Sequence, residues 1–212
     1  MRRIFVLLFL SICFGALAQS PDMPDYRTKR ENFSKITDKN IQNDLAVFTM
    51  SAIDMSVGKL PLKGLPVTDF GENFIQFDSD NIKVIIRAGE FEPDKHKLQY
   101  NGKYLVRIDN KPYYGSYGAV PERTIASVTL LVHGDTIPIP PAAIADLYEP
   151  SFTYLQNGKR KSYNGVYFSN DKRNIYIYML NNDGVGGYEV TWVIQDKKYL
   201  RRVVDFGFLK SL

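Results

Sequence analysis

Apolar and polar side chains alternate along much of the chain, most clearly near its C-terminal end. In Ile175-Tyr176-Ile177-Tyr178-Met179, the isoleucines and the tyrosines fall on opposite faces of an extended strand. Similar stretches separated by turn residues predict a meander of strands at 174–180, 188–195 and 199–206. One face of this meander is expected in the core, and the tyrosine face either packs on a second layer or stays half exposed.

The same pattern predicts four hairpins further upstream. Asn101-Gly102 is the strongest turn signal, because both residues tolerate the positive φ angles of a two-residue hairpin turn. The expected pairs of strands are 74–77 with 82–88, 98–100 with 103–109, 124–133 with 135–139, and 152–155 with 162–168 around Asn157-Gly158.

Two segments have helical features. Ile41, Leu45, Phe48 and Ala52 are spaced as one face of a helix, which favours a helix over 38–53, although alternation in the same segment leaves a strand open. Residues 140–150 predict one short helix, with prolines in its first turn and Pro150 at its end. Its buried face is expected to contain Ile144, Leu147 and Tyr148.

These elements predict a mainly β fold. We expect residues 37–212 to form a single-domain antiparallel β-sandwich or strongly curved sheet, with one or two short helices. Residues 19–36 are polar and contain Pro21 and Pro24, which is typical of a flexible leader.

The first 18 residues match the pattern of a cleavable signal peptide. Met1-Arg2-Arg3 is followed by an apolar run from Ile4 to Phe14, and Ala16 and Ala18 fit the cleavage site. An uncleaved anchor and lipidation of Cys13 are the alternatives. The apolar run is shorter than the roughly 20 residues that a span requires, so no stable membrane span is expected after cleavage. The prediction is export to the periplasm or the extracellular space.

Cleavage would change the available chemistry. It removes Cys13, the only cysteine, which excludes thiolate catalysis and cysteine-ligated zinc in the mature chain. It also removes Arg2 and Arg3, so the net charge falls from +4 to about +2, which does not indicate a nucleic-acid partner. The sequence contains no P-loop and no dinucleotide fingerprint. We therefore expect no cofactor and no metal.

Several blocks of sequence occur together in a familiar arrangement. They are Lys95-His96-Lys97-Leu98, Ile108-Asp109-Asn110-Lys111-Pro112-Tyr113-Tyr114-Gly115, Ile139-Pro140 with Asp146-Leu147-Tyr148-Glu149-Pro150, Asp183-Gly184 through Tyr188-Glu189-Val190-Thr191-Trp192, Lys198-Tyr199 and Arg201-Arg202-Val203. The set resembles uncharacterised exported proteins of Gram-negative bacteria. The resemblance implies export, and it implies no activity and no functional residues.

Three polar groups are weak candidates for chemistry. His133-Gly134-Asp135 would need a nucleophile, and Gly115-Ser116-Tyr117-Gly118 lacks the first glycine of a nucleophile elbow, so a turn histidine is favoured. His96 lies between two lysines and is expected at the surface. Asn181-Asn182-Asp183-Gly184 offers oxygen ligands for calcium, but such residues also serve a plain turn, which is favoured.

The candidate binding residues are Tyr113, Tyr114 and Tyr117, in a glycine-rich loop. Loop tyrosines provide a large contact area at low entropic cost. The basic residues near the last turn, Lys197, Lys198, Arg201 and Arg202, are interpreted as a solvated hairpin end. The leading hypothesis is an exported, non-enzymatic binding module for an unknown protein or glycan. The alternatives are a hydrolase acting on envelope or extracellular polymer, resting on His133, and a periplasmic inhibitor or immunity protein.

Overall fold

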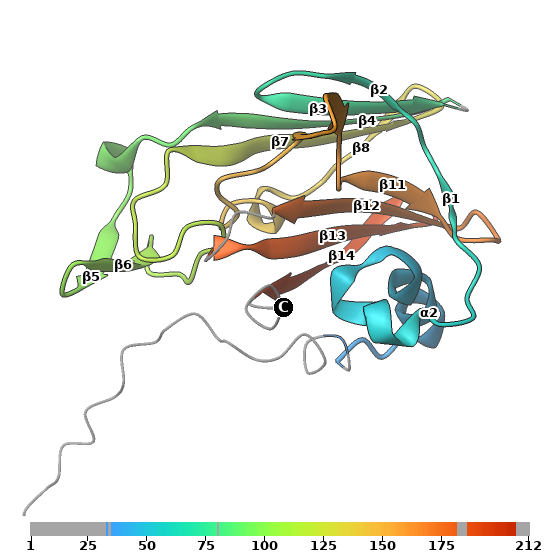
Figure 1. Ribbon diagram of the computed structural model, residues 1–212, viewed down its shortest axis with the longest axis horizontal. Coiled ribbons are helices and arrows are strands. Elements are labelled where there is room, and N and C mark those ends of the chain that lie inside the picture. The colour runs from blue at the N-terminus through green and yellow to red at the C-terminus, as the bar shows by residue number, and fades with distance from the viewer. Residues whose placement is uncertain (1–32, 34, 80, 182–185, 207–212) are drawn as a thin grey trace, which may run out of the picture.

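Two five-stranded antiparallel sheets face each other in the computed structural model (Figure 1), which describes residue 33 and residues 35–79, 81–181 and 186–206. Sheet A has the order β1-β11-β12-β13-β14, and its strands are β1 (Lys63–Gly64), β11 (Gly165–Phe168), β12 (Asn174–Asn181), β13 (Tyr188–Gln195) and β14 (Lys198–Phe206). Sheet B has the order β2-β3-β4-β7-β8, and its strands are β2 (Val67–Phe70), β3 (Phe74–Ser79), β4 (Ile82–Glu90), β7 (Arg123–Val132) and β8 (Asp135–Ile137). Two separate hairpins pair β5 (Leu98–Asn101) with β6 (Tyr104–Ile108) and β9 (Tyr154–Gln156) with β10 (Lys159–Lys161).

The predicted mainly β, sandwich-like fold is confirmed, and its core lies between the two sheets. Because neighbouring side chains on a strand point to opposite faces, every second residue of β12 and β13 enters this core. Ile175, Ile177, Met179 and Trp192 do so from sheet A, and sheet B supplies Ile75, Phe77, Val84, Ile86, Val128, Leu130 and Val132. Each fully buried apolar side chain of this size contributes about 1.5–3 kcal/mol.

A helical layer covers the outer face of sheet A (Figure 1), so β12 and β13 are buried on both faces. Helix α2 (Lys39–Phe48) begins at Asp38, whose carboxylate accepts hydrogen bonds from the next amides, and packs Ile41 and Leu45 on Tyr176. A 3₁₀ helix, η1 (Met50–Met55), follows. The helix predicted over 38–53 is confirmed, in two parts, and the tyrosine face of β12 packs on this second layer.

A buried carboxylate joins the helical layer to the sheet. Glu189 on β13 accepts hydrogen bonds from the amides of Met50 and Ser51, at 2.7 and 2.6 Å, and from the Tyr178 hydroxyl at 2.8 Å. Burial raises the pKa of this carboxyl group above its ordinary value, while these hydrogen bonds oppose the shift. Glu189 thus satisfies the unpaired amides at the start of η1.

The predicted leader extends to residue 36, and its last described residues are packed. Phe33 and Ile36 are buried in one cluster with Ile41 and Leu45 of α2. The predicted signal peptide and the rest of the leader, apart from residue 35, lie outside the described residues.

The helix predicted over 140–150 is wrong. Only Pro141–Ala143 form a 3₁₀ turn, η3, and a similar turn, η2, spans Pro93–Lys95. The backbone after η3 hydrogen-bonds to other segments instead: the Tyr114 amide donates to Asp146 and the Ile125 amide to Leu147. Tertiary pairing therefore overrides the local pattern. The predicted buried face survives in part, because Leu147 and Tyr148 are buried and Ile144 packs partly on the core.

Residues 152–168 also differ from the prediction. The turn at Asn157-Gly158 is present, with Asn157 at φ 51° and Gly158 at φ 73°. It joins β9 to β10, whereas β11 is a separate strand that pairs with β12 in sheet A. Among the described residues, no helix is long and apolar enough to cross a bilayer.

Candidate functional site

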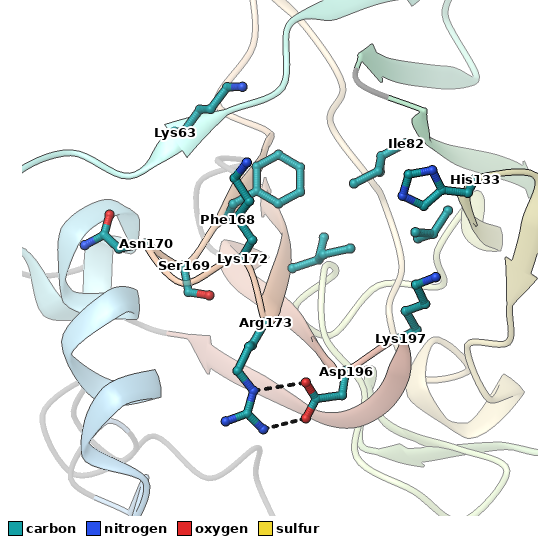
Figure 2. A pocket seen from close by; sticks show the side chains of 12 residues that line it. Lys63, Ile82, His133, Phe168, Ser169, Asn170, Lys172, Arg173, Asp196 and Lys197 are labelled. Atoms are coloured by element: carbon teal, nitrogen blue, oxygen red, sulfur yellow. Dashed lines mark hydrogen bonds and ion pairs between the residues drawn. The ribbon is translucent and has the colours of Figure 1, made fainter.

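Three hairpin turns and the start of β4 meet at one end of the sandwich and surround a cavity of about 580 Å³ (Figure 2). The turns join β7 to β8, β11 to β12 and β13 to β14, and β1 crosses beside them. The lining side chains are Lys63, Ile82, Val132, His133, Phe168, Ser169, Asn170, Lys172, Arg173, Ile175, Asp196 and Lys197. Segments far apart in the sequence thus build one site.

The floor of this end cavity is apolar. Val132 and Ile175 belong to the core between the sheets, and Ile82 and Phe168 pack against that core. Figure 2 shows the Phe168 ring in the middle of the cavity, with the Lys172 side chain beside it. An apolar group entering here would contact the edge of the sandwich core.

The rim of the end cavity is cationic. Four basic side chains, from Lys63, Lys172, Arg173 and Lys197, accompany one carboxylate, Asp196. Arg173 binds Asp196 through two hydrogen bonds of 3.0 and 2.6 Å, and this contact lowers the pKa of Asp196. Neither Lys172 nor Lys197 forms an ion pair with any other residue that the structure describes. The site therefore carries an excess of positive charge.

Several rim residues adopt a left-handed backbone that non-glycine residues rarely accept. The φ angles are 54° at His133, 59° at Lys172, 49° at Asp196 and 61° at Lys197. Glycine or asparagine is the usual choice in such turns, and other residues pay roughly 1–2 kcal/mol for this conformation. Aspartate and histidine tolerate this conformation better than most residues, so Lys172 and Lys197 are the two rim positions where the residue type is least suited to its backbone.

His133, on which the hydrolase alternative rests, lines the end cavity. Its imidazole forms no hydrogen bond or ion pair with the described part of the chain. Ser116, the nearest glycine-flanked serine in the sequence analysis, donates its hydroxyl to the Ala119 carbonyl, in the loop after β6. His133 and Ser116 therefore do not form a nucleophile–base pair.

The three candidate tyrosines do not share one surface. Tyr113 is 4% exposed, and its hydroxyl donates to the carbonyls of Leu105 and Ala119 at 3.1 and 3.3 Å. Burial raises the pKa of Tyr113 to about 12. Tyr114 packs partly buried against Tyr188 and Phe206.

Tyr117 is the most exposed of the three, at 38%. With Tyr104, Asn101 and Ser116 it lines a cleft of about 50 Å³. Only this part of the loop offers an accessible ring.

His96 lies in the loop before β5, and as expected it is not buried. Its Nδ1 is 2.7 Å from Asp109 Oδ2, and its ring stacks on Phe91 at a centroid distance of 4.6 Å. The hydrogen bond from His96 lowers the pKa of Asp109. These contacts fix the loop between η2 and β5.

A second, polar cavity of about 390 Å³ lies between α2 and the β11–β12 turn, and shares Ser169, Asn170 and Arg173 with the end cavity. Within it the Tyr176 hydroxyl donates to Asp44 at 2.6 Å, and burial raises the pKa of Asp44. Within the described ranges, no three His, Cys, Asp or Glu side chains are placed to hold a metal ion. Of the possible calcium loop, only Asn181 lies among these residues.

The end cavity was missed by the sequence analysis except for His133 and Lys197. One signal in the sequence could have pointed to this cavity: charged residues, such as Lys172 and Lys197, occupy turn positions where glycine or asparagine is usual. Lys63 and Ile82 carried no such signal, because only the folded sheets bring them to this end.

Comparison with known proteins assigns the chain to no family. No family model matches the chain, and no curated protein or solved structure is significantly similar to it.

Proposed function

We propose that this protein is an exported binding module whose ligand is an amphipathic anion, held in the end cavity. The observation that carries the proposal is an apolar floor surrounded by a cationic rim in one cavity. A volume of about 580 Å³ lies within the range of roughly 300–1,000 Å³ that is common for small-molecule sites.

The two parts of the cavity favour different parts of one ligand. Phe168, Ile175 and Val132 would cover an alkyl or aryl group, because burying apolar area is favourable. Lys172 and Lys197 would attract a carboxylate or phosphate group from above the floor. A purely apolar ligand would leave the cations unused, and a small inorganic anion would leave the floor exposed.

The test is calorimetric titration of the protein with decanoate, with decanol and decyltrimethylammonium as matched ligands. We expect decanoate to bind with a dissociation constant below about 1 mM, decanol to bind at least tenfold more weakly, and the cation not to bind. Absence of decanoate binding, or equal binding of all three compounds, would contradict the proposal.

A charge-reversal variant tests whether decanoate binds in the end cavity. Lys172→Glu/Lys197→Glu is expected to weaken decanoate binding by at least tenfold. Lys159→Glu/Lys161→Glu changes the net charge equally on exposed β10, outside the cavity, and should leave the affinity unchanged. Equal losses in both variants would show a general charge effect and no site.

A glycan or protein partner at Tyr117 is the second candidate. Tyr104 is 51% exposed beside Tyr117, and Asn101 supplies an amide next to the two rings. Tyr104→Ala/Tyr117→Ala should then abolish capture of an envelope glycan or protein by the immobilised protein. Tyr113 is unsuitable for this test, since its removal would disturb the buried part of the loop.

A further inference from the structure

The β9–β10 hairpin stands apart from both sheets and is exposed. Its strands pair only with each other, in the register Lys159 with Gln156, Arg160 with Leu155 and Lys161 with Tyr154. All seven residues from 155 to 161 are exposed. An element of this kind contributes little to the core and is free to contact another surface.

The hairpin carries concentrated positive charge. Lys159, Arg160 and Lys161 are consecutive, and no acidic residue occurs anywhere between 151 and 170. None of the three cations forms an ion pair with a residue that the structure describes, and Arg160 only donates to the Thr153 hydroxyl at 3.2 Å. The charge is therefore not neutralised within this part of the chain.

Apolar and aromatic side chains accompany these cations. Leu155 is 69% exposed and lies opposite Arg160 in the hairpin register. Tyr154 and Tyr163 stack with a centroid distance of 4.1 Å and an interplanar angle of 13°, and Tyr163 is 43% exposed. Basic residues beside exposed leucine and tyrosine are the combination that favours the interface of an anionic bilayer.

We propose that the β9–β10 hairpin docks on an anionic phospholipid surface. Leu155 enters the boundary between headgroups and acyl chains, and Arg160, on the same face of the hairpin, contacts the lipid phosphates. Lys159 and Lys161 lie on the opposite face and add to the electrostatic attraction of the hairpin to the surface. An acidic polymer would satisfy the cations but would gain nothing from Leu155, so the leucine favours the lipid surface. This inference is independent of the ligand in the end cavity.

The experiment is co-sedimentation of the purified protein with vesicles. Vesicles of 30% phosphatidylglycerol in phosphatidylcholine are compared with vesicles of phosphatidylcholine alone. We expect binding only to the anionic vesicles, and a clear loss of binding when NaCl is raised from about 0.1 to 0.5 M, because salt screens exposed charges.

Two variants separate the electrostatic contribution of the hairpin cations from the contribution of Leu155 entering the bilayer. Each basic residue near an anionic surface contributes about fivefold in affinity, so Lys159→Gln/Arg160→Gln/Lys161→Gln should weaken binding by about a hundredfold. Leu155→Ser should weaken it by about tenfold. The control Lys97→Gln/Lys103→Gln/Lys111→Gln makes the same change in charge at other exposed positions and should retain most of the binding. Unchanged thermal midpoints would show that all variants are folded.

Four outcomes would overturn the inference. The first is equal binding to vesicles with and without phosphatidylglycerol. The second is equal loss in the hairpin and control variants. The third is unchanged binding of Leu155→Ser together with equally tight binding of soluble dextran sulfate, which would identify an acidic polymer as the partner. Loss of vesicle binding in Lys172→Glu/Lys197→Glu, but not in the hairpin variant, would likewise move the contact to the end cavity.

Discussion

The two ends of the sandwich are built from the same strands but are filled differently. β13 begins with Tyr188 at one end and reaches the Asp196 turn at the other, eight residues later and roughly 26 Å away. At the Tyr188 end, aromatic rings fill the space around the sheets, since Tyr114 packs on Tyr188 and Phe206. At the Asp196 end, a cavity of about 580 Å³ is left open.

Loop length explains this difference. At the aromatic end, around Tyr188, two long segments meet, because the Tyr148 amide after η3 donates to the Tyr114 carbonyl after β6. The Tyr188 hydroxyl donates in turn to the Tyr148 carbonyl at 3.1 Å. At the cationic end, around Asp196, β7–β8 and β13–β14 are joined by two residues each, and β11–β12 by five. Such short turns cannot cover the gap of about 10 Å between packed sheets. Under the proposed function, this open end receives the ligand, and the side chains of its turns select it.

The largest change in the free energy of unfolding is expected at Gly115, where the aromatic end is most tightly packed. Gly115 has φ +111°, and a Cβ atom there would lie 2.0 Å from the Tyr148 carbonyl oxygen. Gly115→Ala should therefore lower the free energy of unfolding by more than about 3 kcal/mol, or prevent folding. Urea denaturation measures this loss.

Gly102→Ala is the control, because Gly102 has φ +59° and no atom within 4 Å of an added Cβ. It should cost only about 1 kcal/mol. Similar losses in the two variants would mean that the loop is not held against Tyr148.

The next largest change in the free energy of unfolding is expected at Glu189, which is adjacent to Tyr188 but lies on the outer face of sheet A. Glu189→Gln replaces one acceptor oxygen with a donor that faces the amides of Met50 and Ser51. The expected loss is about 1–3 kcal/mol of unfolding free energy near pH 7. An unchanged stability would contradict the role of Glu189 in holding η1.

The pH dependence of stability gives a second readout for Glu189. Its folded-state pKa is raised above the ordinary value of 4.5 by burial. Between these two values the folded protein binds more protons than the unfolded chain, so this carboxyl group makes stability fall as pH rises through that interval. Denaturation at a series of pH values should show that Glu189→Gln removes this contribution.

A smaller effect is expected from the hydroxyl of Tyr113. Tyr113→Phe leaves the carbonyls of Leu105 and Ala119 without this donor and should cost about 1 kcal/mol. Tyr104→Phe, at a half-exposed ring, should change the free energy of unfolding by less than about 0.5 kcal/mol. If the two variants were equally stable, the Tyr113 hydroxyl would not hold the loop, and the contrast between the ends would weaken.

At the cationic end, a substitution should raise the free energy of unfolding, in contrast to the losses expected above. Lys197→Gly relieves a left-handed residue at φ 61° and should stabilise the protein by roughly 0.5–1 kcal/mol. The same change should weaken decanoate binding, because it removes a rim cation. Lys198→Gly, one residue later at the start of β14, should lose about 0.5–1 kcal/mol instead. A destabilised Lys197→Gly variant would mean that Lys197 serves the fold and not a ligand.

The elements with strong local signals could be predicted from the sequence. The Ile175–Tyr176 alternation and the helix after Asp38 depend on neighbouring residues, and both are present. The hairpin predicted around Asn101-Gly102 is also present, but its turn lies one residue later, at Gly102 and Lys103, because Asn101 pairs with Tyr104 as the last residue of β5. The helix over 140–150 failed because distant segments, around Tyr114 and Ile125, pair with its backbone.

The candidate site could be predicted only in small part. The tyrosine-rich loop was identified as a binding surface from its composition, but the burial of Tyr113 depends on packing against Leu105 and Tyr148. The end cavity depends on which turns the sheet topology brings together. Lys63 and Lys197 are 134 positions apart in the sequence, and no local pattern relates them.

The most direct test is to titrate ¹⁵N-labelled protein with decanoate and follow the amide chemical shifts. We expect saturable shifts at His133, Lys172 and Lys197, and unchanged amides in the loop 113–117. Shifts centred on Tyr117, with none in the three turns at the cationic end, would contradict the assignment of the binding site to the end cavity.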